Sequence, residues 1–208
     1  MKSFLQSERL NIFSEFAFVG IFFVFALIAL GFFPTTFNVY TNFLSDLGGH
    51  VKNPVGGIFF NLGCILGAVA FFIFVGSLVG WHYPQKWQKN TVYVSQLIGG
   101  VSALGMMMIG IITEDNYSVH ITWAGFFFVC LSLFIVLLSI LLIFTPPRFF
   151  RLISVFGFAV AIFGVYFDIG AHTQFMELIA VILSLAFFVL LGIGKLAVKL
   201  RESKNEED

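Results

Sequence analysis

Six long runs of apolar residues set the strongest limit on what this chain can fold into. They cover residues 14–33, 54–80, 92–113, 120–144, 152–170 and 174–194. Each is close to the roughly 20 residues that a helix needs to cross a bilayer core about 30 Å thick. With 59% hydrophobic residues, 11% charged residues and a mean hydropathy of +1.00, a chain of 208 residues cannot hide this surface in a water-soluble core. The sequence therefore predicts an all-α fold, a bundle of six transmembrane helices.

Proline and glycine positions agree with this division. All five prolines fall between the runs or at their ends, where a residue without a backbone N–H does least harm to a helix. The glycines at positions 63, 67, 99, 100, 105 and 110 fall within the second and third runs and predict closely packed helices. Because the loops are short, we expect one membrane domain over residues 1–208, with residues 195–208 as a cytoplasmic tail.

Lysine and arginine are concentrated on one side of the expected bundle. The N-terminus, the second and fourth loops and the C-terminal tail hold ten of the eleven, and only Lys52 lies on the other side. The positive-inside rule then predicts cytoplasmic N- and C-termini in a multi-pass protein of the cell membrane. The first, third and fifth loops are expected to face outward.

These outer loops carry most of the remaining ionisable groups. Residues 46–50 (DLGGH) recur with conservative changes as residues 168–172 (DIGAH), and residues 114–120 (EDNYSVH) supply carboxylates and a histidine again. Glu177 lies about one turn inside the last run, where an unpaired carboxylate costs roughly 2 kcal/mol or more. We expect it to find a partner in His120, Asn61 or His172.

A metal site is one chemistry that these residue types favour. Three imidazoles and a carboxylate suit zinc, and an open coordination position would let the metal activate water. A metal-free alternative uses an aspartate–histidine pair to activate water or a serine, and a purely structural alternative takes the same residues as turn and capping groups. The candidate metal ligands are His50, His120, Asp168 and His172, and the candidate catalytic residues are Ser45, Asp46, Glu114, Asp115 and Glu177.

Several short motifs resemble a known family. Residues 42–48 (NFLSDLG) followed by Asn53-Pro54, then Glu114 with His120, and Met176-Glu177 at the start of the last run, resemble the prokaryotic six-span family called domain of unknown function 998. The resemblance covers nearly the whole chain and implies the topology without an activity, but Asp168 and His172 match no pattern of that family. A more distant likeness, in residues 45–48 (SDLG) and 120–125 (HITWAG), is to the DRAM and Sfk-type membrane proteins, and it implies a link to lipid remodelling.

These expectations describe an integral membrane protein with a His/carboxylate pocket at its extracytoplasmic face. The pocket is expected to bind a lipid headgroup or to hydrolyse it with the help of a metal ion. A noncatalytic membrane organiser and a small-solute transporter are the alternatives. The transporter predicts charged residues near the middle of the spans, where the expected spans have none. Membrane lipids are the expected partners and nucleic acid is not, whereas enzymatic activity and oligomeric state are left open by the sequence.

Overall fold

The computed structural model describes residues 2–78, 84–170 and 172–207, and within them the side chains of residues 8–204. The end of the expected second span, at residues 79–80, and Ala171 of the second pentapeptide lie outside the described residues. Six long helices and two short 3-10 turns make up the regular structure of this part of the chain. They are α1 (Lys2–Gly31), η1 (Leu44–Gly48), α2 (Gly56–Ser77), α3 (Lys86–Ile111), η3 (Glu114–Asn116), α4 (Tyr117–Ile143), α5 (Phe149–Ile169) and α6 (Gln174–Glu207).

Each of the six helices contains a segment long and apolar enough to cross a membrane. These segments are Glu8–Gly31, Gly56–Ser77, Lys86–Ile111, Glu114–Ile143, Phe149–Ile169 and Gln174–Lys204. The predicted all-helical, six-span fold is therefore confirmed. The helices α1 and α6 extend beyond the apolar runs because helical hydrogen bonding continues into charged sequence, which a hydropathy pattern does not register.

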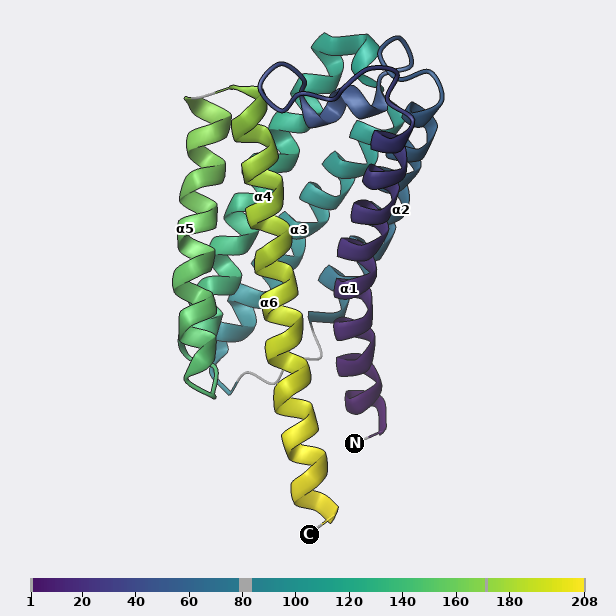
Figure 1. Cartoon of the computed structure of the whole chain (residues 1–208). Helices are drawn as coiled ribbons and strands as arrows, with labels where there is room; N and C mark the ends of the chain where they lie inside the picture. Colours follow the sequence, from purple (N-terminus) through teal and green to yellow (C-terminus); the bar gives the residue numbers. More distant parts are fainter. Residues whose placement is uncertain (1, 79–83, 171, 208) are drawn as a thin grey trace.

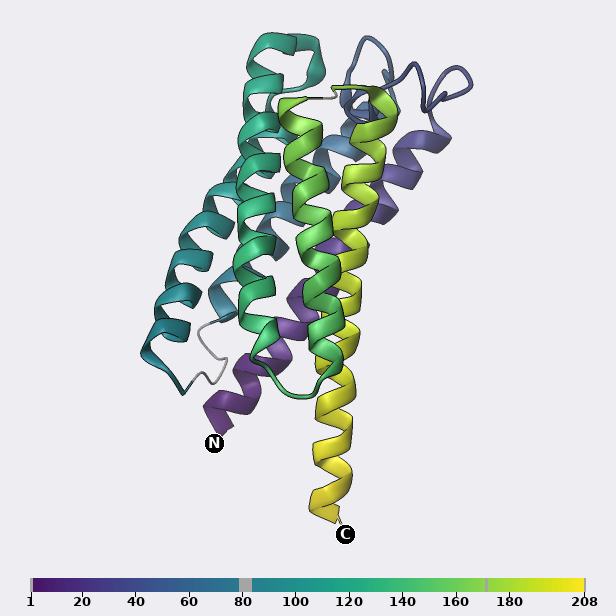
Figure 2. The same ribbon diagram turned by 90° about the vertical axis from the view of Figure 1, so that its left-hand side faces the viewer.

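The six helices run along the long axis of one elongated bundle (Figures 1 and 2). In Figure 1 the first and last helices have their chain ends at the same end of the bundle, and α6 extends past the other helices there. The opposite end carries η1, η3 and the connection between α5 and α6. We call it the η1 end.

Glycine brings neighbouring helices into close contact, as the sequence predicted at most of the positions named. A methyl group at Gly110 of α3 would lie 2.6 Å from the Asn61 carbonyl oxygen of α2, and one at Gly99 would lie 2.9 Å from the Phe134 ring of α4. Gly100 differs, because a methyl group there would meet only the Phe72 ring at 3.8 Å, an ordinary contact.

A cluster of phenylalanine rings fills the centre of the bundle. Its members are Phe18, Phe71, Phe74, Phe134 and Phe188, each at most 3% exposed. The rings of Phe18 and Phe71 stack at 4.7 Å between centroids, and five other pairs meet edge to face at 5.4–6.2 Å. These geometries are favourable for aromatic pairs. This aromatic cluster joins α1, α2, α4 and α6. It lies on the bundle-centre side of the site described next.

Candidate functional site

The short turn η1 is folded back onto the helix ends by asparagine side chains. Asn53 donates from Nδ2 to the carbonyl oxygens of Ala29 and Leu47, both at 3.0 Å. Asn61 of α2 donates to the carbonyl oxygen of Gly48, also at 3.0 Å. Because buried main-chain carbonyls need such partners, the two asparagines fix η1 across the end of the bundle.

Lys52 bridges two buried carboxylates at the η1 end. Its Nζ lies 2.8 Å from Asp46 Oδ1 and 2.9 Å from Glu114 Oε1, and Asn42 donates to the second oxygen of Asp46 at 3.1 Å. Partial burial of Lys52 opposes its charge, but its hydrogen bonds and charge attraction with Asp46 and Glu114 outweigh that effect and raise its pKa. Asp46 and Glu114, both candidate catalytic residues, are thus held in a salt bridge that fastens one loop to another.

Asp115 ties the same two loops together from outside. Its carboxylate accepts the backbone N–H groups of His50 at 2.8 Å and Val51 at 3.1 Å, together with the hydroxyl of Thr113 at 3.0 Å. The imidazole of His50 is exposed next to this contact. The structure thus places Asp115 and His50 on the outer surface of the loops, where they line neither of the two cavities described below.

Glu177 connects α6 to η1. Its side chain is 8% exposed, and its Oε2 accepts the backbone N–H of Leu44 at 2.5 Å. The sequence predicted a partner for this carboxylate in a side chain of His120, Asn61 or His172. The hydrogen-bond donor is instead the main chain of η1, which no spacing within the sequence could indicate because the two residues are 133 positions apart.

His120 presents one ring nitrogen to an interior cavity. The side chain is 5% exposed, and its Nδ1 lies 2.6 Å from the carbonyl oxygen of Ile112. Since a carbonyl oxygen only accepts hydrogen bonds, Nδ1 carries the proton, and Nε2 of the neutral ring is an acceptor. In the described part of the protein Nε2 is buried and has no hydrogen-bond partner.

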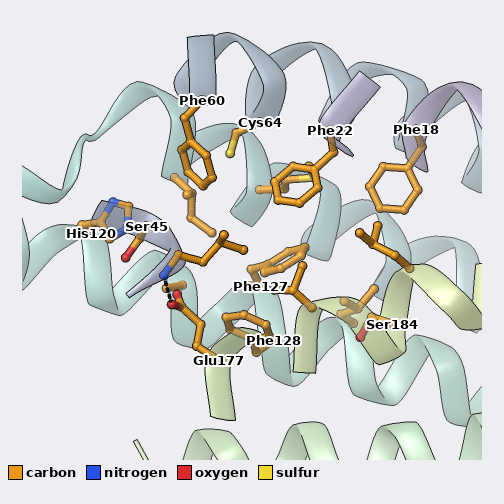
Figure 3. Close-up of a pocket in the computed structure, with 17 residues that line it drawn as sticks. Phe18, Phe22, Ser45, Phe60, Cys64, His120, Phe127, Phe128, Glu177 and Ser184 are labelled. Carbon is orange, nitrogen blue, oxygen red and sulfur yellow. Dashed lines mark hydrogen bonds between the residues drawn. The ribbon is translucent and has the colours of Figure 1, made fainter. Parts of the chain in front are cut away.

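The cavity that His120 borders is mostly apolar, with three polar residues grouped at one end and Ser184, whose hydroxyl donates to the Ala180 carbonyl oxygen at 2.8 Å, away from them (Figure 3). Its volume is about 60 Å³, and Figure 3 shows Ser45, His120 and Glu177 grouped together at that end, with phenylalanine rings along the remainder. Phe18, a member of the aromatic cluster, lines the cavity from the other end. Five helices supply the apolar walls. The residues are Phe18 and Phe22 of α1; Phe60 and Cys64 of α2; Met106 and Ile109 of α3; Ala124, Phe127, Phe128 and Leu131 of α4; and Val181 and Leu185 of α6.

A second cavity, of about 80 Å³, meets the first at its polar end. Both are lined by Ser45, His120, Ala124, Phe128 and Glu177. The second cavity adds Asp168 and His172, from the end of α5 and the start of the connection to α6, with Phe43, Tyr117 and Phe167 as aromatic neighbours. We call the two spaces the inner and outer cavities.

The structure separates the candidate site residues into two groups. Ser45, His120, Asp168, His172 and Glu177 line the outer cavity. The other four, Asp46, Glu114, Asp115 and His50, make the loop contacts described above. Across the described ranges, no three histidine, cysteine or acidic side chains are arranged to share a metal ion. The expected zinc ligand set is therefore not assembled, because His50 sits outside the cavities that His120 and His172 line.

A buried ion pair lies towards the other end of the bundle. Lys195 Nζ of α6 lies 2.5 Å from Glu15 Oε2 of α1 and 2.7 Å from Asn11 Oδ1, and Asn11 donates to Ser77 Oγ of α2 at 2.8 Å. Glu15 is fully buried. The sequence assigned Lys195 to a tail, although Gly192, three residues earlier, allows the close approach of α1 at the pair: a methyl group there would lie 3.1 Å from Glu15 Oε2.

Fold and loop structure define the chain as a polytopic helical membrane protein with a partly polar cavity system at one end. It belongs to the family described as protein of unknown function (DUF998), whose model matches residues 17–194. No curated protein and no solved structure matches the chain. The family confirms the first resemblance, and the likeness to DRAM and Sfk-type proteins stays an expectation.

Proposed function

We propose that this protein binds a membrane amphiphile at the η1 end of its bundle. The headgroup would lie in the outer cavity, among Ser45, His120 and Asp168, and an apolar chain would enter the inner cavity between the phenylalanine rings. The observation that carries the proposal is that His120 lines both cavities and that its buried Nε2 has no hydrogen-bond partner in the described structure. Such a polar atom is costly to bury, and a ligand that donates to it removes that cost.

The size of the cavities limits the ligand. At about 60 and 80 Å³, they are each smaller than an engineered apolar cavity of about 150 Å³ that binds benzene. They suit a small headgroup and the first part of one chain, rather than both chains of a lipid. Binding has better support than metal-assisted hydrolysis, because Lys52 and the loop N–H groups engage three of the five candidate catalytic residues, Asp46, Glu114 and Asp115.

Blocking the junction of the two cavities tests this function. Ala124 of α4 lines both cavities, so Ala124→Phe should fill the junction and reduce binding of a neutral probe, dodecanol, by about tenfold or more. Leu133→Phe is the matched control, because Leu133 lies on the same helix and is 46% exposed. Binding is measured on the full chain in phosphatidylcholine nanodiscs. Equal dodecanol affinity in the two variants would contradict the proposal.

A further inference from the structure

The junction of the two cavities is lined by groups that accept hydrogen bonds. Nε2 of His120 is an acceptor because Nδ1 donates to Ile112. Asp168 and Glu177 are carboxyl groups, and Ser45 has a hydroxyl that both accepts and donates. Among the described residues that line the two cavities there is no lysine or arginine. A ligand in this position must therefore bring donors with it.

We propose that the site selects a primary ammonium headgroup. This inference rests on the proposed function and names the class of amphiphile that it would bind. An ammonium group has three N–H donors and a positive charge. It could donate to His120 Nε2 and to Asp168 at once, with the Ser45 hydroxyl as a third acceptor. The buried Nε2 of His120, which has no partner among the described residues, would then be satisfied.

The same end of the bundle already contains an ammonium held in this way. Lys52 Nζ lies between Asp46 and Glu114, 2.8 and 2.9 Å from a carboxylate oxygen of each. The outer cavity offers similar chemistry with Asp168 and Glu177, and its described lining, which includes the imidazole of His172, has no lysine or arginine. Its aromatic residues, Phe43, Tyr117, Phe128 and Phe167, add ring faces of the kind that attract cations.

Other headgroups fit the lining less well. A phosphate would face two carboxyl groups without a lysine or arginine to balance its charge. A quaternary ammonium has the charge but no N–H to donate to His120 Nε2. A hydroxyl headgroup donates once and lacks the charge. The lining therefore ranks a primary ammonium first among groups of similar size.

A set of dodecyl amphiphiles that differ only in headgroup tests this ranking. Dodecylamine, dodecanol, dodecyl phosphate and dodecyltrimethylammonium are compared at equal mole fraction with the full chain in phosphatidylcholine nanodiscs. We expect dodecylamine to bind about tenfold or more tightly than each of the others, because a charge-assisted hydrogen bond is stronger than a neutral one. Methylammonium, which has the headgroup without the chain, should not displace it.

Two substitutions assign the preference to particular atoms. Asp168→Asn should reduce dodecylamine affinity by about tenfold and leave dodecanol affinity nearly unchanged. Asp115→Asn is the matched control, since it makes the same charge change at the same end of the bundle but outside both cavities. It should leave the preference for dodecylamine intact.

His120 is tested with two variants, because its Nδ1 donates a hydrogen bond to Ile112 and its Nε2 is the acceptor offered to the ligand. In His120→Asn the side-chain amide N–H can replace Nδ1 as donor to Ile112, while the acceptor at Nε2 is lost. In His120→Gln the amide extends towards the Nε2 position and supplies an acceptor there. We expect weak dodecylamine binding in the first variant and partial recovery in the second.

The outcomes separate the inference from the function on which it rests. Dodecanol binding that Ala124→Phe removes, without a preference for dodecylamine, would overturn the ammonium inference and leave amphiphile binding standing. Tighter binding of dodecyl phosphate or dodecyltrimethylammonium than of dodecylamine would also overturn it. If none of the four amphiphiles binds, both the inference and the proposed function are wrong.

Discussion

Lys52 distinguishes the carboxylates that hold the loops together from those that line the cavities. The sequence grouped Asp46 with Asp168 because each begins a similar pentapeptide. In the structure Asp46 is 1% exposed and paired with Lys52, whereas Asp168 lines the outer cavity. A local motif does not determine which distant residue approaches a side chain, so the two copies could not be told apart from the sequence.

Removing the ammonium of Lys52 should destabilise the η1 end. Lys52→Met leaves Asp46 and Glu114 without their shared cation, and we expect a loss of about 1–2 kcal/mol in the free energy of unfolding. This is less than for a fully buried pair because the Lys52 side chain is 49% exposed and partly screened by solvent. Thermal unfolding in micelles measures the loss. The double variant Lys52→Met/Glu114→Gln should recover part of it, and no recovery would argue against charge as the cause.

The raised pKa of Lys52 also predicts a pH dependence. Because the folded-state pKa lies above the unfolded value of about 10.4, the stabilisation is fully present below about pH 10 and is lost as the pH rises through the folded value. The difference in melting temperature between wild type and Lys52→Met should therefore shrink in alkaline buffer, as Lys52 loses its proton. A difference that persists undiminished in strongly alkaline buffer would show that the charge of Lys52 does not cause it.

At the scale of the helices, the Glu15–Lys195 pair joins α1 to α6 within their candidate spans. Asn11 extends the contact to Ser77 of α2, and the ammonium lies 4.9 Å from the centre of the Phe74 ring. The sequence predicted the six spanning helices because long apolar runs indicate where a chain can cross a membrane. It did not predict this pair, because the two residues lie near opposite ends of the chain, Glu15 at the start of the first expected span and Lys195 in the expected tail.

The pair predicts a distinctive pattern of stability. Glu15→Leu or Lys195→Met alone leaves one buried group without its partner and should cost about 3–5 kcal/mol. The double variant removes both charges and should be clearly more stable than either single variant. Unfolding in mixed micelles gives the three values. A double variant as unstable as the sum of the two singles would show that the two side chains act independently.

Close packing of α2 on α3 gives a second prediction at this scale. Gly110→Ala would force a methyl group against the Asn61 carbonyl at 2.6 Å and should cost about 1–3 kcal/mol. Gly100→Ala on the same helix meets only the Phe72 ring at 3.8 Å, so its cost should be small. Parallel melting curves compare the two, and equal losses would contradict the packing explanation.

For the whole molecule, the even number of spans places both chain ends on one side of the membrane, as Figure 1 shows for the bundle. The distribution of lysine and arginine predicts that this side is the cytoplasm. The orientation in the membrane is thus a prediction from the sequence. The cavities differ in this respect. The inner cavity is lined by residues of five helices and η1, and residues of α5 add to the lining of the outer cavity, and such a meeting of distant residues follows only from the fold.

Cysteine labelling tests the orientation. In a background of Cys64→Ala and Cys130→Ala, a membrane-impermeant maleimide should label Val51→Cys in intact cells and should label Glu202→Cys only after permeabilisation. Val51 is 83% exposed at the η1 end, and Glu202 is exposed near the end of α6. Labelling of Glu202→Cys in intact cells would reverse the predicted orientation.

Amphiphile binding inside the bundle is the central claim, and photo-crosslinking with a diazirine-bearing fatty alcohol tests it most directly. Peptide mapping should locate the crosslinks on cavity-lining residues of α4 and α6, such as Phe127, Phe128 and Val181, and unlabelled dodecanol should compete them away. Crosslinks confined to outward-facing residues such as Leu133 and Ile162, 46% and 71% exposed, would contradict the claim.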